Sequence, residues 1–273
     1  MRTRVLVPAV VAGLLIALVP TTAQAAHPRY VVSASISAVK ADVGATVKVS
    51  GTVAGKAAAK KTVYLQRKIG AGAWSTVGST RTTAGRRYTF THRVGATGAQ
   101  TFRVYAPKSK YRSAGYSTAR SLVGWTWLDL SRQPVMSFGY VSNGMSVTLG
   151  STVYSHAFSL WINNGVTASE IYAKVNGSCD RATYRAGVDP AWGNTAAEWT
   201  DRVIPFDRTQ SVSIQIWTAT RATPRDVSVA LTSGIYIFAI TYGGSLNTAL
   251  GVVNPRVHCR VGALPVFAWN ELD

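Results

Sequence analysis

The chain has 273 residues, of which 47% are hydrophobic and 15% are charged, a composition that supports buried cores rather than general disorder. The net charge of +18 is unevenly distributed: residues 26–120 hold 17 Lys and Arg against a single acid, Asp42, whereas residues 121–273 are balanced. Seven of the eight Trp lie in the second half. These shifts predict two domains, 26–120 and 121–273, with a boundary near Leu122-Val123-Gly124.

The first residues have the layout of a secretory signal peptide. Arg2 and Arg4 precede an apolar stretch from Val5 to Val19, and Ala23-Gln24-Ala25 is an A-x-A cleavage signal. This stretch is shorter than the roughly 20 apolar residues that span a bilayer, and no later stretch is long enough either. We therefore expect residues 1–25 to be removed and the protein to be secreted to an extracellular location, without a transmembrane segment.

Residues 30–120 alternate apolar and polar positions in short runs that are separated by glycines. These runs are Val47–Val49, Thr62–Gln66, Trp74–Val77, Tyr88–Thr91 and Thr101–Tyr105. A period of two, with β-branched and aromatic residues and a turn about every ten residues, is typical of an all-β sandwich.

Several of these segments resemble the Ig-like modules that are common in exported actinobacterial proteins. The matching segments are Gly44–Gly51, Lys61–Arg67, Ala73-Trp74, Tyr88–Phe90 and Phe102–Ala106. The resemblance implies an Ig-like β-sandwich over residues 26–120, which in that family serves as a spacer or an adhesive unit.

The second half also contains runs typical of strands. They are Ser146–Leu149, Ser211–Trp217, Val227–Leu231 and Ile235–Ile240, with prolines between or beside them. Residues 121–273 are therefore predicted to form a second all-β domain.

The order of features in this half resembles the NPCBM/NEW2 family of sugar-binding modules. The matching features are Leu149-Gly150, Tyr154–Ala157, Cys179–Asp189, Pro224 with Val227–Gly234, and Arg256–Cys259. The resemblance implies a jelly-roll β-sandwich that binds carbohydrate. The segment Thr248–Asn254 lacks the acidic, His and Trp groups that relatives often have there, so contacts made by that segment are lost here or serve another ligand.

Two cysteines, Cys179 and Cys259, lie too far apart for C-x-x-C chemistry, and only His258 stands beside them as a metal ligand. In an exported chain they predict a structural disulfide. The chain-entropy model gives roughly 4 kcal/mol for a loop of about 80 residues.

Catalytic motifs are absent from the sequence, which has no G-x-S-x-G, H-E-x-x-H, P-loop or dinucleotide fingerprint. Glu198 and Asp201 are the nearest pair of carboxylates, but a spacing of three in a strand directs them to opposite faces. We interpret both as solvated surface acids. We expect no enzymatic activity and no required cofactor.

Aromatic residues beside polar ones are the better candidates for a site, because sugars stack C–H faces on flat rings. Trp161 precedes Asn163-Asn164-Gly165, and Trp192 lies between Asp189-Pro190 and Gly193-Asn194, so both are predicted in polar loops. The predicted carbohydrate-binding residues are His156, Trp161, Asn164, Asp189 and Trp192.

Other readings of these candidates stay open. His156 is either a ligand contact, as its family position implies, or a satisfied buried histidine. Asp189 accepts sugar hydroxyls, coordinates a structural Ca²⁺ or caps the turn before Pro190. The remaining tryptophans are predicted to pack in the core or at the ends of the domain: Trp125, Trp127, Trp199, Trp217 and Trp269. Tyr242, which precedes two glycines, is a minor candidate for a sugar contact.

The first domain carries three groups of cations. They are Lys56, Lys60 and Lys61; Arg86 and Arg87; and Lys108, Lys110 and Arg112. They predict attraction to an anionic cell-surface polymer, such as a teichoic-type polymer, an acidic polysaccharide or lipid headgroups, although charge that only keeps a spacer soluble is the simpler reading. Nucleic acid is not expected as a partner of a secreted protein without a recognition helix.

Taken together, the sequence predicts a secreted, non-catalytic carbohydrate-binding protein whose partner is a glycan or a cell-wall polysaccharide. Its first domain would act as a basic spacer or cell-surface attachment unit. The alternative is an adhesion or structural extracellular protein without a sugar site, and a third reading is a small secreted glycosidase or inhibitor.

Overall fold

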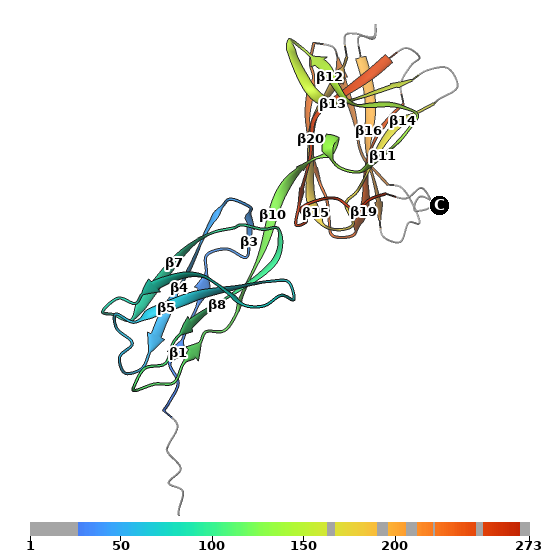
Figure 1. Ribbon diagram of the computed structural model, residues 1–273. Helices are drawn as coiled ribbons and strands as arrows, with labels where there is room; N and C mark the ends of the chain where they lie inside the picture. Colours follow the sequence, from blue (N-terminus) through green and yellow to red (C-terminus); the bar gives the residue numbers. More distant parts are fainter. Residues whose placement is uncertain are drawn as a thin grey trace, which may run out of the picture.

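The computed structural model describes residues 27–162, 167–189, 196–205, 212–220, 222–243 and 248–267. Within these ranges the chain is almost entirely β-strand and forms two lobes joined end to end (Figure 1). The all-β prediction is therefore confirmed. A short 3-10 helix, η1 (Leu130–Arg132), packs into the second lobe through Leu130. No helix in these ranges has the length and apolarity to cross a membrane.

The first lobe is a sandwich of two sheets. Its strands are β1 (Val31–Val32), β2 (Ser35–Ile36), β3 (Lys40–Asp42), β4 (Thr46–Ala54), β5 (Thr62–Ile69), β6 (Ser75–Arg81), β7 (Arg87–Arg93), β8 (Gly98–Ala106) and β9 (Gly115–Tyr116). One sheet contains β1, β2, β4 and β7, and the other contains β6, β5, β8 and β9. Alternate residues of β4 and β5, such as Val49 and Leu65, face a core completed by Phe102 and Val104.

One long strand, β10 (Arg120–Asp129), belongs to both lobes. Residues 120–124 pair with β8 and residues 123–125 run parallel to β3, whereas residues 126–129 pair with β20 (Thr248–Cys259) of the second lobe. The boundary predicted near residues 122–124 therefore falls inside a strand rather than in a linker. Because the backbone hydrogen bonds continue through it, β10 connects the lobes stiffly.

The second lobe is also a sandwich of two sheets. Its further strands are β11 (Val135–Phe138), β12 (Tyr140–Leu149), β13 (Thr152–Ile162), β14 (Ser169–Lys174), β15 (Cys179–Val188), β16 (Ala196–Pro205), β17 (Val212–Thr220), β18 (Arg225–Ala230) and β19 (Ile235–Tyr242). The first sheet has the order β12-β13-β20-β15-β18, and the second has the order β11-β14-β19-β16-β17. Their facing sides bury a core that includes Phe158, Leu160, Trp199 and Phe238.

The outer side of the first of these sheets is partly covered by its own hairpin. Val147 and Leu149, near the turn between β12 and β13, are buried with Ala157 and Val253 in a small separate cluster. A Cβ atom on Gly251 would lie 2.4 Å from Val147 Cγ1, so the hairpin packs here because β20 has no side chain at this position.

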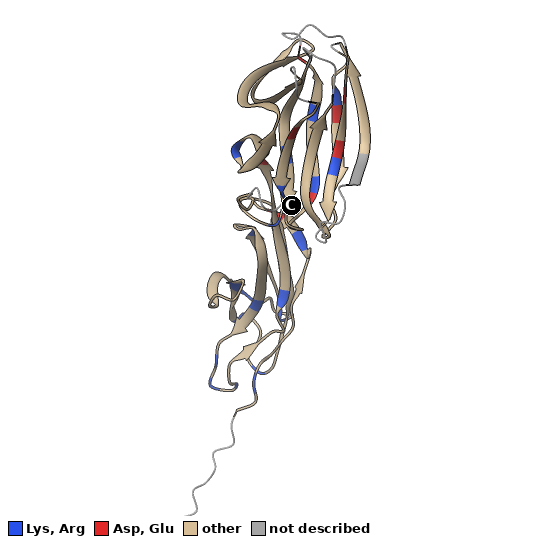
Figure 2. Ribbon diagram, turned by 90° about the vertical axis from the view of Figure 1, so that its right-hand side faces the viewer, with Lys and Arg blue, Asp and Glu red and all other residues tan. Residues whose placement is uncertain are grey.

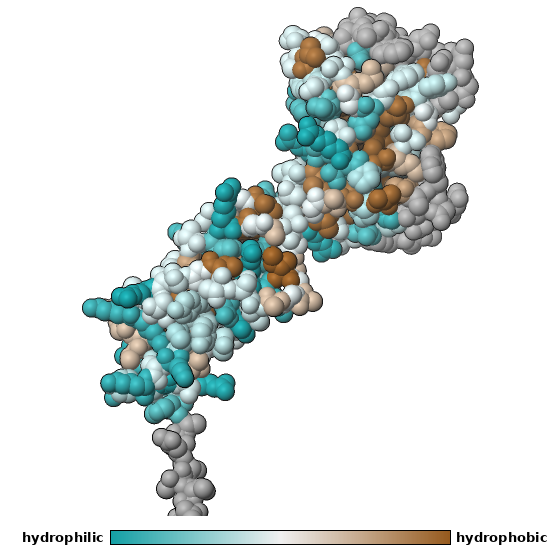
Figure 3. Space-filling model, viewed as in Figure 1, coloured by the Kyte–Doolittle hydropathy of each residue, from teal (hydrophilic) through white to brown (hydrophobic). Residues whose placement is uncertain are grey.

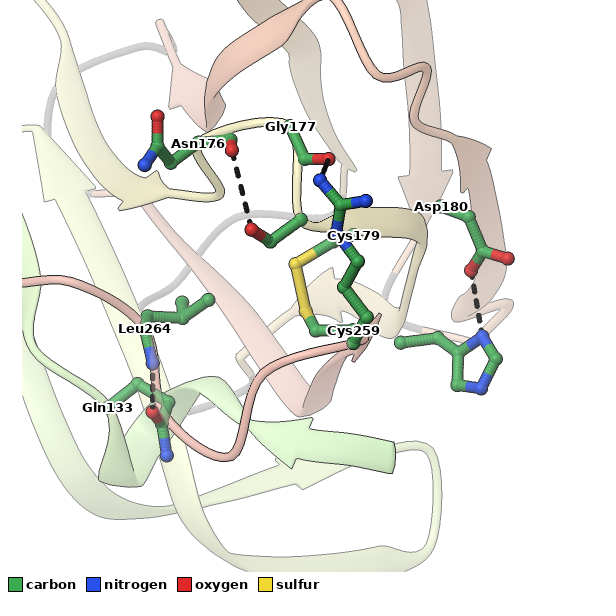
Figure 4. The surroundings of a disulfide bond; sticks show 10 residues. Gln133, Asn176, Gly177, Cys179, Asp180, Cys259 and Leu264 are labelled. Carbon is green, nitrogen blue, oxygen red and sulfur yellow. Dashed lines mark hydrogen bonds and ion pairs between the residues drawn. A yellow bond between two sulfur atoms is a disulfide. The ribbon is translucent and has the colours of Figure 1, made fainter. Parts of the chain in front are cut away.

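The predicted disulfide between Cys179 and Cys259 is present, and it joins directly paired residues of β15 and β20 (Figure 4). Asp180 lies beside it and points toward the ring of His258, with Nδ1 of His258 2.7 Å from Asp180 Oδ1. Gln133 accepts a hydrogen bond of 2.9 Å from the backbone N–H of Leu264, which holds the segment after β20 against the start of the lobe.

Candidate functional site

An aromatic platform lies at the edge of the second lobe. Tyr140 on the edge strand β12 is directly opposite Trp161 on β13, and their rings are nearly parallel, with centroids 5.9 Å apart and an angle of 19° between planes. Tyr140 is 37% exposed, and Phe138 just before it is 53% exposed. Three aromatic side chains at or near the surface are thus grouped at one edge, and we call this group the aromatic platform.

The backbone at this edge is fixed by a buried serine. Ser169 on β14 is fully buried, and its hydroxyl donates to the Trp161 carbonyl at 2.7 Å and accepts from the Tyr140 N–H at 2.9 Å. Gly139 crosses between the two sheets with φ +73°, and a Cβ there would lie 2.5 Å from the Ala168 carbonyl. Only glycine fits this crossing, which places Phe138 and Tyr140 on neighbouring ends of different sheets.

Two of the predicted sugar contacts, Trp161 and Asp189, lie at the same end of one sheet. Trp161 pairs with Ala249 of β20, and the Asp189 N–H donates to the Ala249 carbonyl at 3.3 Å. The strands that carry Trp161 and Asp189 are therefore two strand spacings apart, about 9–10 Å. Trp161 is half-buried and Asp189 is buried, so the aromatic ring is the more accessible group of the two.

The prediction that Trp161 lies in a loop is wrong, because it lies inside β13. Phe158, Leu160 and Ile162 alternate into the core, and this alternation places Trp161 on the outer side of the sheet. The polar residues that follow Trp161 suggested a loop, although the period of two before them indicates a strand. Its partner Tyr140 was missed because cross-strand pairing depends on register, which only the packed sheet defines.

His156 does not join the aromatic platform. It is exposed, so the buried-histidine reading is wrong, and it has the left-handed φ of +59° at an irregular part of β13. Five residues separate it from Trp161, which is roughly 16 Å along a strand. Asn164 and Trp192 lie outside the described residues, as does Trp269.

Asp201 is buried rather than solvated, which corrects the surface-acid prediction. It has no exposed area, because alternate residues of β16 face the core of the second lobe. These residues are Ala197, Trp199, Asp201 and Val203. Glu198 is exposed on the other side of the strand, so the two carboxylates face apart as predicted.

Hydrogen bonds across the sandwich satisfy this carboxylate. Tyr184 of the facing sheet donates to Asp201 Oδ1 at 2.5 Å, and Trp217 Nε1 donates to Oδ2 at 2.6 Å. Trp199 Nε1 in turn donates to the Tyr184 hydroxyl at 2.8 Å. Burial raises the pKa of Asp201 to about 6, although both hydrogen bonds act in the opposite direction. This network connects the two sheets inside the core of the second lobe.

The remaining predicted aromatic positions are mostly structural. Trp199 and Tyr242 are fully buried, which confirms the core prediction for Trp199 and removes Tyr242 as a surface contact. Trp217 is half-buried against the core. Trp125 and Trp127 lie where the lobes meet, each with its ring about 5 Å from that of His258. Among the described residues no group of three or more His, Cys, Asp or Glu could hold a metal ion.

Cations from separate parts of the sequence meet at the free end of the first lobe. Lys56 and Lys110 lie 4.3 and 5.0 Å from the ring centre of Tyr111, and Lys61 lies 4.5 Å from that of Tyr30. The Tyr30 hydroxyl donates to the Lys56 carbonyl at 3.2 Å. We call these five residues the basic pole; hydrophilic side chains project from this end of the lobe (Figure 3).

Acidic residues lie away from the basic pole. Figure 2 shows Asp and Glu gathered mainly on the second lobe. Asp42, the one acid of residues 26–120, lies at the junction of the lobes, where its Oδ1 is 2.9 Å from His258 Nε2. The basic pole therefore has no acidic neighbour from its own lobe.

No family model and no curated protein sequence matches this chain. Among solved structures, it is similar to the enzymatically active domain of tailspike protein 4 of bacteriophage CBA120, with 13% sequence identity and a TM-score of 0.25 over 52% of this chain. This chain spans 19% of that structure's length. A likeness at this level carries no argument about fold or function.

Proposed function

We propose that this protein is a secreted, non-catalytic glycan-binding protein whose aromatic platform stacks on sugar rings. The observation that carries the proposal is the nearly parallel pair of Tyr140 and Trp161, with exposed Phe138 beside it. Flat rings on a rigid sheet lose little conformational entropy on binding, and their faces match the C–H faces of sugars. The disulfide supports an oxidising, extracellular location.

A glycan array tests this proposal with the full secreted chain. Trp161→Ala and Tyr140→Ala are expected to weaken binding about tenfold or more, because each removes a stacking surface. Trp74→Ala is the matched control, since Trp74 is also half-buried but lies in the first lobe. If the wild-type protein binds no glycan, or if Trp161→Ala binds as well as Trp74→Ala, the proposal is wrong and an adhesion or structural role without this site is favoured.

The basic pole supports a second part of the proposal, attachment to an anionic cell-surface polymer. Four-carbon lysine stems beside Tyr30 and Tyr111 present their charges at a single end of the molecule. Binding of this kind is weakened by salt because exposed charges are screened over about 10 Å at 0.1 M ionic strength. We expect retention on cell-wall fractions at low salt and release at high salt. Lys56→Gln with Lys110→Gln should abolish retention, whereas Lys48→Gln with Lys68→Gln, which removes the same charge elsewhere, should not.

A further inference from the structure

A groove of about 610 Å³ lies on the outer side of the second lobe, away from the aromatic platform. Its walls come from β13, β15, β18 and β20, and the residues that matter to the argument are Tyr154, Arg185, Asp226, Asn254 and Arg256. A volume of this size is typical of small-molecule sites in proteins and accommodates one or two sugar units.

The groove forms where β20 bulges against β15. Thr183 pairs with Arg256 and Arg185 pairs with Val253, so Asn254 and Pro255 together oppose Tyr184 alone. Asn254 has the left-handed φ of +48° that such an extra residue requires. Bulges re-aim the side chains on either side of them, and here the bulge places Asn254 and Arg256 on the groove.

The charges in the groove leave one guanidinium unmatched. Arg185 Nη1 donates to both carboxylate oxygens of Asp226, at 3.1 and 2.9 Å, while its buried Nε has no hydrogen-bond partner. Arg256 is exposed, and none of the described residues forms an ion pair or side-chain hydrogen bond with it. The groove therefore has an excess positive charge and donors directed at whatever enters it.

Tyr154 supplies an aromatic wall beside these donors. Its ring packs against the small cluster of Val147, Leu149, Ala157 and Val253, which holds it in place. Its hydroxyl has no hydrogen-bond partner within the described part of the chain. The groove thus combines a fixed ring, unsatisfied donors and the amide of Asn254.

We propose that this groove binds a sugar unit that carries a carboxylate, that is, a uronic acid within a glycan. The planar guanidinium of Arg256 matches a carboxylate with two parallel hydrogen bonds, Tyr154 matches the sugar face, and Asn254 donates to and accepts from hydroxyls. The site is independent of the aromatic platform, because seven residues of β20 separate Arg256 from Ala249, which is roughly 20 Å. The proposal for the groove can therefore be correct or wrong independently of the proposed function.

Calorimetric titration of the full secreted chain tests the proposal. The probes are trisaccharides of galacturonate, glucuronate and mannuronate, the methyl ester of each, and inorganic phosphate. We expect at least one uronate to bind and its neutral ester to bind at least tenfold more weakly, because the charged hydrogen bonds are lost. Arg256→Gln should weaken binding by a similar factor and Tyr154→Phe by a few fold.

Arg181→Gln is the matched control, because Arg181 is an exposed arginine of β15 that does not line the groove. Arg181→Gln should bind with an affinity within about twofold of wild type. Thermal unfolding of both Arg variants checks that each is folded. Absence of binding to all three uronates, equal binding of the ester, or an unchanged affinity in a folded Arg256→Gln variant would overturn the proposal. Phosphate that binds as tightly as the uronate would also overturn it in favour of a general anion site.

Discussion

His258 Nε2 lies 2.9 Å from Asp42 Oδ1, so the last strand of the second lobe contacts the first lobe across 216 positions of sequence. The other ring nitrogen lies 2.7 Å from Asp180 Oδ1, and Lys40 of the first lobe pairs with Asp180. Lys40 also lies 4.0 Å from the ring centre of Trp125. These contacts and the shared strand β10 hold the two lobes in one relative orientation.

Asp180→Ala is expected to loosen this junction, because it removes the acceptor shared by Lys40 and His258. Lys40 and Asp180 are both partly exposed, so their ion pair is worth at most about 1 kcal/mol. Small-angle scattering should show a broader range of overall lengths for this variant. Asp226→Ala, which breaks an exposed ion pair away from the junction, should scatter like the wild type. Identical curves for Asp180→Ala and wild type would show that the contacts of Asp180 are not needed to fix the orientation.

The junction should also resist acid. Burial acts to raise the pKa of Asp180, but hydrogen bonds and positive charge from Lys40 and His258 lower it overall, below the ordinary 3.8. A carboxylate with a depressed pKa stabilises the contact at higher pH, and the effect is lost only as the pH falls through the depressed value. Scattering curves at pH 7 and pH 5 should therefore superimpose. A change of shape between them would contradict this prediction.

Asp201 should make stability depend on pH in the opposite sense. Its folded-state pKa of about 6 is above the ordinary 3.8, so the folded protein binds this proton more tightly. This contribution is complete below about pH 4 and is lost as the pH rises through 6, on the order of 3 kcal/mol. Asp201→Asn should remove that slope from urea unfolding measured between pH 4 and 7. Glu198→Gln, an exposed acid of the same strand, should retain it.

Gly251→Ala is expected to lift the β12–β13 hairpin from the sheet. The new methyl group would meet Val147 Cγ1 at 2.4 Å and Leu149 Cδ2 at 3.2 Å, so these side chains must move. Overpacking of this kind costs typically about 1–3 kcal/mol. Thermal unfolding and proteolysis within the hairpin measure the effect. Gly262→Ala is the control, because its nearest contact would be an ordinary 3.7 Å.

Removal of the disulfide should lower the stability of the second lobe. Cys179→Ala with Cys259→Ala removes a cross-link between residues 80 positions apart. This change should lower the free energy of unfolding by about 3–5 kcal/mol. Urea unfolding of the oxidised protein, the reduced protein and the double variant measures the difference. Reduction should have no effect on the double variant; if it does, the loss seen in the wild type does not come from this bond.

The sequence by itself determined the strands, the disulfide and the division of charge. A period of two is local, so the alternation in Thr62–Gln66 and Val227–Leu231 predicted the observed β5 and β18. The chain has only two cysteines, which left one possible pairing, and that disulfide is present. None of these inferences needed knowledge of which strands become neighbours.

The tertiary structure alone decided which residues meet. Register pairs Tyr140 with Trp161, and the bulge at Asn254 opens the groove beside Arg256. Packing buries Asp201 under Tyr184 of the facing sheet, although an acidic residue type suggested the surface. Strand neighbours in a sandwich come from distant parts of the chain, so their contacts depend on sheet order and register, which a local pattern does not contain.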